Sequence, residues 1–113
     1  MPIVHGITNL YQELYYTRGQ IAKIHKFGLF SKIENIIIDC LELAITAALT
    51  ERSYKSPLIK KLKIQIEVVK KLIRLLWELK IINDKKYLLF SQKLVEISKM
   101  ASGWIKYLNR EPV

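Results

Sequence analysis

The chain has 113 residues, half of them hydrophobic, with four glycines and three prolines. A chain of this length can bury roughly 65% of its unfolded surface, so we expect residues 1–113 to form a single domain. The apolar content excludes an intrinsically disordered chain, and the few glycines and prolines exclude a loop-rich scaffold. The one cysteine, Cys40, cannot form an intrachain disulfide, and nothing indicates an oxidising compartment.

The formal net charge of +9 is unevenly distributed along the chain. Residues 1–54 carry five basic and five acidic groups, whereas residues 55–113 carry fourteen basic and five acidic groups. A basic half on a compact domain is typical of proteins that bind a polyanion, most often nucleic acid. A lysine-rich solvated surface without such a partner is the alternative, and charge alone does not choose between the two.

Signals for export or membrane insertion are missing from the sequence. The first residues contain no basic segment followed by an apolar one, so we expect no signal peptide. No uncharged stretch approaches the roughly 18 residues that a membrane span needs. We therefore expect a soluble, cytoplasmic protein with no membrane partner.

The first of four helically periodic segments spans about residues 7–24. Apolar residues recur there at helical spacing, with an interruption near Arg18 and Gly19. The stripe consists of Ile7, Leu10, Leu14, Ile21 and Ile24. Residues 25–30 follow as a connector in which Gly28 is the expected turn residue.

The second segment spans about residues 31–53. Ser31 and Glu34 have the spacing of a capping box, in which the serine caps free amides and the glutamate reaches back. The polar positions of this segment fall almost entirely on one line, and all other positions are apolar. This apolar face is broader than a surface helix of a monomer usually buries.

The third segment starts at Ser56 and Pro57, with the serine as N-cap and the proline at the first helical position. Its main apolar seam consists of Ile59, Leu62, Ile66, Val69, Ile73 and Leu76. A second apolar stripe consists of Ile64, Val68, Leu72, Leu75 and Leu79.

Asn83 and Asp84 break the pattern and can cap the fourth segment, which spans about residues 85–108. Its seam consists of Phe90, Leu94, Ile97, Ala101, Trp104 and Leu108. Four such segments with short connectors predict an all-α fold, an antiparallel up-down four-helix bundle. The surplus apolar area on the second and third segments predicts a homo-oligomer.

No catalytic or metal-binding constellation is evident. His5 and His25 lack the Glu-x-x-His partner that metal sites in bundles use. Cys40 has apolar neighbours and is expected in the core, and the carboxylates of Asp39 and Glu42 are expected on a solvated face. No glycine-rich phosphate loop occurs. We expect no cofactor, no metal and no small-molecule substrate, and therefore a protein that binds and is not an enzyme.

Five aromatic residues are compatible with either packing or base stacking. Trp77 and Trp104 lie near seam positions, which favours core packing. Tyr11, Tyr15 and Tyr16 are as compatible with helix packing as with stacking on bases.

The candidate nucleic-acid-binding residues are basic side chains of the third and fourth segments. They are Lys60, Lys63, Lys70, Lys71 and Arg74 on the third, and Lys99, Lys106 and Arg110 on the fourth. Consecutive helices of an up-down bundle are neighbours, so the two rows are expected to merge into one basic surface. Arg74 is the strongest candidate because a guanidinium grips phosphate in bidentate fashion. The alternative is that Arg74 pairs with Glu78 one turn on.

Residues 32–43, 72–79 and 94–106 resemble the Avd family, the accessory variability determinants of diversity-generating retroelements. The most specific run is Glu96-Ile97-x-x-Met100-x-x-Gly103-Trp104-Ile105-Lys106. The resemblance implies a basic, barrel-like homopentamer that binds a reverse transcriptase and its template RNA, and possibly DNA. It also implies a role in mutagenic cDNA synthesis and retrohoming.

Other functions remain open at this point. Related four-helix-bundle proteins are encoded in ribosomal RNA intervening sequences, so a general nucleic-acid-binding or scaffold oligomer without a reverse transcriptase is the alternative. A membrane-surface bundle would need a free apolar face beside the basic one, whereas the seams are expected to be used in packing.

Overall fold

The computed structural model describes residues 1–110 and contains four long helices, with a short helical connection between the first two. The elements are α1 (Pro2–Arg18), α2 (Lys23–His25), η1 (Lys26–Phe30), α3 (Ser31–Leu49), α4 (Arg52–Glu78) and α5 (Asp84–Asn109). All regular structure in these 110 residues is helical. The predicted all-helical bundle is therefore confirmed.

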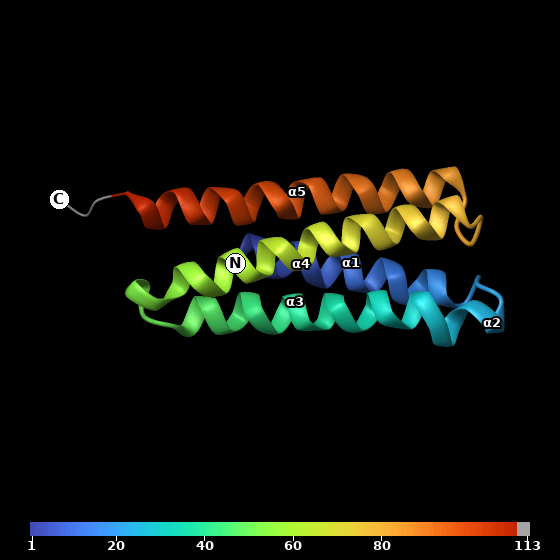
Figure 1. The fold of residues 1–113 in the computed structure, drawn as a ribbon, viewed down its shortest axis with the longest axis horizontal. Helices are drawn as coiled ribbons and strands as arrows, with labels where there is room; N and C mark the ends of the chain where they lie inside the picture. Colours follow the sequence, from blue (N-terminus) through green and yellow to red (C-terminus); the bar gives the residue numbers. More distant parts are fainter. Residues whose placement is uncertain (111–113) are drawn as a thin grey trace.

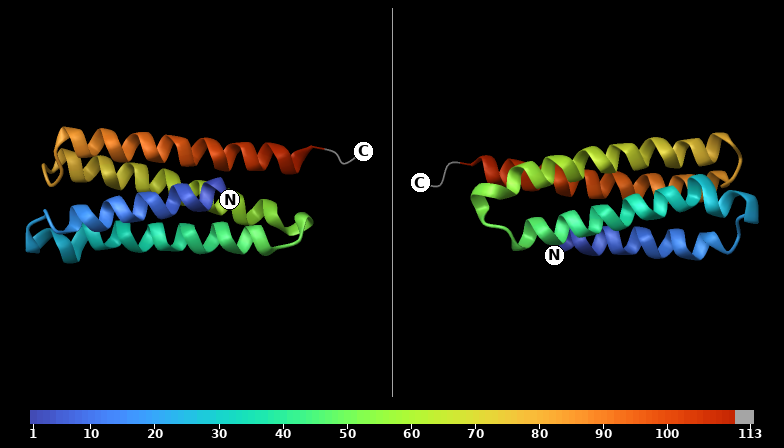
Figure 2. Two further views of the ribbon diagram at one scale, coloured as in Figure 1. Left: turned by 180° about the vertical axis from the view of Figure 1, so that it is seen from behind. Right: turned by 60° about the horizontal axis from the view of Figure 1, so that its bottom comes forward.

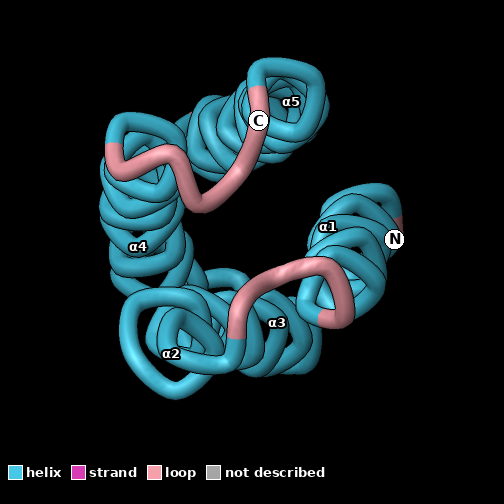
Figure 3. Tube along the Cα trace, turned by 90° about the vertical axis from the view of Figure 1, so that its right-hand side faces the viewer, coloured by secondary structure: helices cyan, strands magenta, loops and turns pink. Residues whose placement is uncertain are grey.

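The four long helices lie along one axis of a molecule that measures 54 × 21 × 19 Å. Figure 1 shows that the chain reverses direction from each long helix to the next. α1 and α4 each pack against both α3 and α5, so the helices surround a shared core, as the view along the axis in Figure 3 shows. α4 and α5 form the most extensive of these helix pairs.

The core consists of the apolar stripes that face inward from each helix. Its largest fully buried side chains are Phe30, Phe90, Ile7, Leu10, Leu14, Ile33, Ile37, Ile59, Leu62, Ile66, Ile73 and Leu76. Burying each such side chain stabilises the fold by about 1.5–3 kcal/mol. The predicted main seam of α4 is buried along its whole length, from Ile59 to Leu76.

The bundle has four helices over only part of its length. Figures 1 and 2 show the start of α1 part-way along the molecule, whereas α3, α4 and α5 continue beyond it. The buried positions towards that end include the small residues Ala44, Ala47 and Ala101. Small side chains allow helices to approach more closely, which suits a section with only three of them.

The predicted bounds of the first helix, residues 7–24, are wrong at both ends. α1 begins at Pro2, where the fixed φ of proline suits a first helical position, and Ile3 is buried. It ends at Arg18, and the chain becomes extended at Ala22 (φ −57°, ψ 141°). Ile21 is therefore buried, whereas Ile24 is 82% exposed.

The predicted capping box at the start of α3 is also wrong. η1 leads directly into α3, so Ser31 has helical dihedral angles (φ −62°, ψ −38°) and its position is inside a continuing helix. Glu34 is buried, and its carboxylate accepts a hydrogen bond from the Arg18 guanidinium of α1. α3 ends at Leu49, four residues before the predicted end at 53, because Thr50 is extended (φ −91°, ψ 150°).

α4 begins at Arg52, earlier than the predicted start at Ser56 and Pro57. Pro57 lies inside the helix, which costs about 3 kcal/mol because one backbone hydrogen bond is lost. Tertiary bonds of the first turn offset this cost. The Arg52 guanidinium donates to the Tyr107 carbonyl at 3.2 Å, and Lys55 Nζ donates to the carbonyls of Ala47 and Ala48 at 2.8 and 3.1 Å.

The predicted start of the fourth helix is confirmed to within one residue. Asn83 caps α5, because its side-chain oxygen accepts a hydrogen bond from the Lys86 amide at 2.8 Å. α4 ends in a Schellman motif, in which the amides of Lys80 and Ile81 donate to the carbonyls of Trp77 and Leu76.

Candidate nucleic-acid interface

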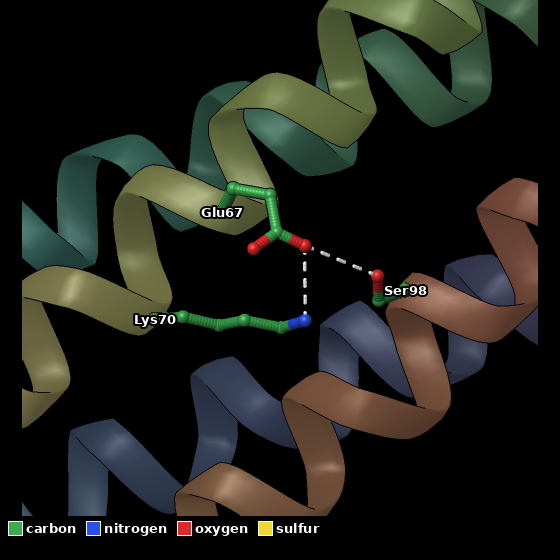
Figure 4. Close-up of polar contacts among 3 residues, drawn as sticks. All are labelled: Glu67, Lys70 and Ser98. Carbon is green, nitrogen blue, oxygen red and sulfur yellow. Dashed lines mark hydrogen bonds and ion pairs between the residues drawn. The ribbon is translucent and has the colours of Figure 1, made fainter.

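The five basic candidates of α4 form the α4 basic strip, defined as Lys60, Lys63, Lys70, Lys71 and Arg74. Lys60, Lys71 and Arg74 are exposed, and Lys63 and Lys70 are half-buried. Most of the strip lies on the side of α4 that faces α5, because Glu67 on the same side accepts a hydrogen bond from Ser98 of α5 at 3.4 Å. Figure 4 shows this contact.

Lys70 has an acidic partner within its own helix. Its Nζ lies 3.0 Å from Glu67 Oε1, one turn back (Figure 4). The hydrogen bond from Lys70 lowers the pKa of Glu67 below its ordinary value of 4.5, with a smaller contribution from the Ser98 hydroxyl. The charge of Lys70 is thus partly compensated, and this side chain is less available to a phosphate than its position in the strip suggests.

Arg74 also has an acidic partner, Glu78, and this pairing is the alternative to phosphate binding that the sequence suggested. Its Nε donates to Glu78 Oε1 at 3.1 Å, and both side chains are more than half exposed. Exposed ion pairs contribute only about 0–1 kcal/mol, so a phosphate can displace or share this contact. Within residues 1–110 the two terminal nitrogens of this guanidinium make no hydrogen bond.

The basic candidates of α5 form the α5 basic row, defined as Lys99, Lys106 and Arg110, and all three are exposed. Ser98 faces α4, and Met100 faces α1 at Gly6. At about 100° per residue, Lys99 therefore points outward between them. A band of uncharged α5 residues, among them Val95, Ser98 and Ser102, separates the row from the α4 basic strip.

The sequence interpretation missed two features of this region. The first is Glu67 as the acidic partner of Lys70, which the spacing of three residues could have indicated. The second is an open pocket at the end of the bundle, whose lining includes Trp77, Lys80 and Lys85. The lysines on both sides of the Asn83 turn were its only sequence signal.

The aromatic residues divide between packing and exposure. Trp77 and Trp104 are half-buried against the core, as packing requires, and the Trp104 ring lies under Lys55 Nζ at 5.8 Å. Tyr11 also packs against the core, whereas Tyr15 and Tyr16 are 59% and 68% exposed.

The side chains considered for catalysis or metal binding include a buried thiol and two exposed carboxylates. Burial and the nearby Asp39 raise the pKa of the Cys40 thiol to about 12, so this cysteine is a core residue and not a nucleophile at neutral pH. Asp39 and Glu42 are exposed on α3. Within residues 1–110 no three metal-ligating side chains form a group, and no helix combines the length and apolar character needed to cross a bilayer.

Comparison with models of protein families matches residues 1–108 to the family described as bAvd-like. This match covers nearly the whole chain and agrees with the resemblance carried by residues 32–43, 72–79 and 94–106. No curated protein and no solved structure matches the chain significantly.

Proposed function

Because the chain belongs to the bAvd-like family, we propose that it is the accessory protein of a diversity-generating retroelement. In this role it binds the reverse transcriptase and the template RNA, and possibly DNA, and supports mutagenic cDNA synthesis and retrohoming. The family match over residues 1–108 is the observation that carries the proposal.

The exposed basic side chains of α4 and α5, in two separate rows, support the nucleic-acid part of this proposal. Lys60, Lys71 and Arg74 are exposed on one helix, and the α5 basic row is exposed on its neighbour. The chain does not resemble a base-reading module, so these basic groups are expected to contact mainly phosphates, and binding is expected to tolerate changes of sequence. Each phosphate that is neutralised releases counterions, so the affinity should fall steeply as salt is added.

We also propose that the bundle, which the periodic segments and short connectors predict to be antiparallel, assembles as a homopentamer, the assembly that the resemblance implies. Exposed apolar side chains support an assembly. On α4 and at its C-cap they include Ile64, Val68, Leu75 and Leu79, which are 40–65% exposed, and on α3 they include Leu49, which is 84% exposed. The α3 surface also carries exposed Asp39 and Glu42, and the exposed Lys61 lies beside the α4 stripe. The acidic α3 groups of one copy can thus pair with Lys61 of the next in a head-to-tail ring.

Nucleic-acid binding is tested by titrating a structured RNA and following its mobility in gels at low and moderate salt. Lys70→Ala with Arg74→Ala is expected to weaken binding severalfold and to leave helicity and oligomer size unchanged. The matched control is Lys23→Ala with Lys32→Ala, which removes the same charge from exposed positions outside the two rows. Equal binding by both double variants, or an affinity independent of salt, would show that the α4 basic strip is not the interface.

Assembly and partner are tested separately. Light scattering is expected to give a pentamer, and Val68→Glu with Leu75→Glu should shift it to smaller species, whereas Leu88→Glu at an exposed position of α5 should not. Co-expression with the reverse transcriptase gene of the same locus should yield a complex that survives purification. A monomer at micromolar concentration, or no complex with the enzyme, would remove the corresponding part of the proposal.

A further inference from the structure

The end of the bundle that is seen in Figure 3 holds an open pocket of about 1170 Å³. Its wall on one side is formed by Thr17, Gln20 and Ile21, at the end of α1 and in the loop after it. The opposite wall is formed by residues of the α4–α5 turn and the helix ends around it, between Trp77 and Lys86. Two loops that are some 60 positions apart in the sequence thus create one concave site.

An aromatic group held in a fixed position forms part of this wall. The Trp77 ring stacks on the Tyr87 ring, with centroids 4.7 Å apart and planes inclined by 12°. The indole N–H of Trp77 donates to Asp84 Oδ1 at 2.7 Å. Contacts to both its ring and its N–H fix the indole, so the pocket has a rigid aromatic side that a flat ligand can contact.

Three lysines, Lys80, Lys85 and Lys86, line the same pocket. Within residues 1–110 their ammonium groups make no ion pair and no hydrogen bond. Of the two acidic residues of the lining, Glu78 pairs with Arg74, whereas Asp84 keeps its negative charge because its partner, the Trp77 indole N–H, is neutral. Three lysines thus outnumber the one carboxylate whose charge has no basic partner, and the pocket carries an excess of positive charge.

The backbone at Lys80 is strained. Lys80 has φ +61° at the end of α4, and no other residue among 1–110 that is not glycine has a positive φ. Glycine is the residue that the Schellman motif favours at this position, and other residues pay a cost to occupy it. Glycine would adopt this φ at a lower conformational cost than lysine. The presence of lysine therefore indicates that its side chain has a function, because backbone strain of this kind clusters at functional sites.

From these observations we propose that the end pocket binds the phosphomonoester of a nucleotide unit. Lys80, Lys85 and Lys86 hold the phosphate, and the base or ribose lies against the Trp77 side. A terminal phosphate carries about −1.5 to −2 charges at neutral pH, more than an internal phosphodiester, and thus matches several lysines better. The terminal nucleotide of a strand and a free mononucleotide carry this same chemistry. Binding of a strand's terminal nucleotide rests on the proposed function, whereas binding of a free mononucleotide does not.

The strand-end source is tested with a short single-stranded RNA, labelled at its 3′ end and carrying either a 5′-phosphate or a 5′-hydroxyl. Fluorescence anisotropy of the parent protein should show severalfold tighter binding of the 5′-phosphorylated RNA. Lys80→Gly with Lys85→Ala should abolish this preference and leave binding of the 5′-hydroxyl RNA nearly unchanged. Glycine adopts φ +61° without steric cost, so this variant is expected to fold. The control Lys60→Ala with Lys63→Ala should weaken binding of both RNAs and keep the preference.

The mononucleotide source is tested by titrating AMP and following the NMR signal of the Trp77 indole N–H. A saturable shift that is lost in the Lys80→Gly, Lys85→Ala variant supports the pocket, even if the protein binds no RNA and the proposed function fails. A preference for the 5′-phosphate that persists in this variant would place the phosphate site elsewhere. The proposal is overturned if the parent shows neither the preference nor a shift with AMP.

Discussion

The carboxylate of Glu34 in α3 is buried against α1, where it accepts a hydrogen bond from the guanidinium of Arg18. The Arg18 guanidinium also lies 5.6 Å from the centre of the Phe27 ring, so one side chain joins α1, η1 and α3. Removing the arginine leaves a buried negative charge without a partner. Since Arg18 itself is 29% exposed, we expect Arg18→Ala to lower the free energy of unfolding by about 2 kcal/mol.

Urea unfolding followed by far-UV circular dichroism measures this loss. Glu34→Gln, which keeps an acceptor and removes the charge, should cost less than Arg18→Ala. The double variant Arg18→Ala with Glu34→Gln should be more stable than Arg18→Ala alone. If the double variant is the less stable of the two, the charge at position 34 is not the source of the loss.

Lys80→Gly is expected to stabilise the chain. The substitution relieves the strain of φ +61° at the end of α4, which should raise the free energy of unfolding by about 0.5–1 kcal/mol. Thermal unfolding measures the change. Lys80→Ala serves as the control, because alanine removes the ammonium group but keeps the strain. A gain of the same size in Lys80→Ala would assign the effect to charge and not to the backbone.

Lys55→Met should destabilise the connection between α3 and α4. Lys55 Nζ donates to the last carbonyls of α3, those of Ala47 and Ala48, and methionine keeps the length of the side chain without the donor. Hydrogen bonds from charged donors contribute about 1.5–3 kcal/mol, and because Lys55 is only half-buried we expect a loss of about 1–2 kcal/mol. Lys60→Met, at an exposed position of α4 away from the proposed subunit interface, is the matched control in the same denaturation experiment. A similar loss in both variants would contradict a specific role for Lys55.

The contact between Lys70 and Glu67 predicts a dependence on pH. The pKa of Glu67 is lowered in the folded chain, chiefly by the hydrogen bond from Lys70, so the ionised carboxylate stabilises the fold above its unfolded pKa of about 4.5. This contribution is lost as the pH falls through the lowered value. It should be small, because Glu67 is exposed and solvent screens the pair.

An NMR titration of the Glu67 carboxyl carbon measures this pKa directly. In Lys70→Met the pKa of Glu67 should rise back towards 4.5, whereas in Lys71→Met, one position along, it should stay low. An unchanged pKa in Lys70→Met would show that the pair does not persist in solution. Glu67→Gln should also strengthen RNA binding by releasing Lys70, if the α4 basic strip is the interface.

Spacing along the sequence was sufficient to predict the core of α4, whose six seam residues are all buried, and the core of α5 as far as Ala101, because buried residues recur there every three or four positions. The predicted seam residues Trp104 and Leu108 are only half-buried. Spacing failed where local signals compete with tertiary contacts. Pro57 normally marks a helix start, but Arg52 and Lys55 hold an earlier turn through bonds to other helices. Ser31 and Glu34 have the residue types and spacing of a capping box. The Glu34 carboxylate instead accepts a hydrogen bond from Arg18, which lies 16 positions away.

The candidate site was predictable in part for a similar reason. Helical spacing indicated that most of the α4 basic strip shares one side of the helix. It could not show whether Lys70 and Arg74 turn towards solvent or towards Glu67 and Glu78, because this depends on side-chain conformation. The end pocket was beyond prediction, since Thr17 and Trp77 come together only when α1 and α4 end at the same level of the bundle.

The partial length of α1 divides the molecule into two zones of unequal resistance to local opening. Where α1 is present, α3 and α5 each pack against it as well as against α4, and Leu10 and Leu14 fill the interior. In the three-helix zone, at the end of α3, the start of α4 and the end of α5, the large side chains of Leu49, Tyr54 and Tyr107 are 84%, 67% and 56% exposed. Amide hydrogens there should exchange with solvent faster than those near Leu14, so the zone is the natural place for the chain to adapt its shape without unfolding the rest.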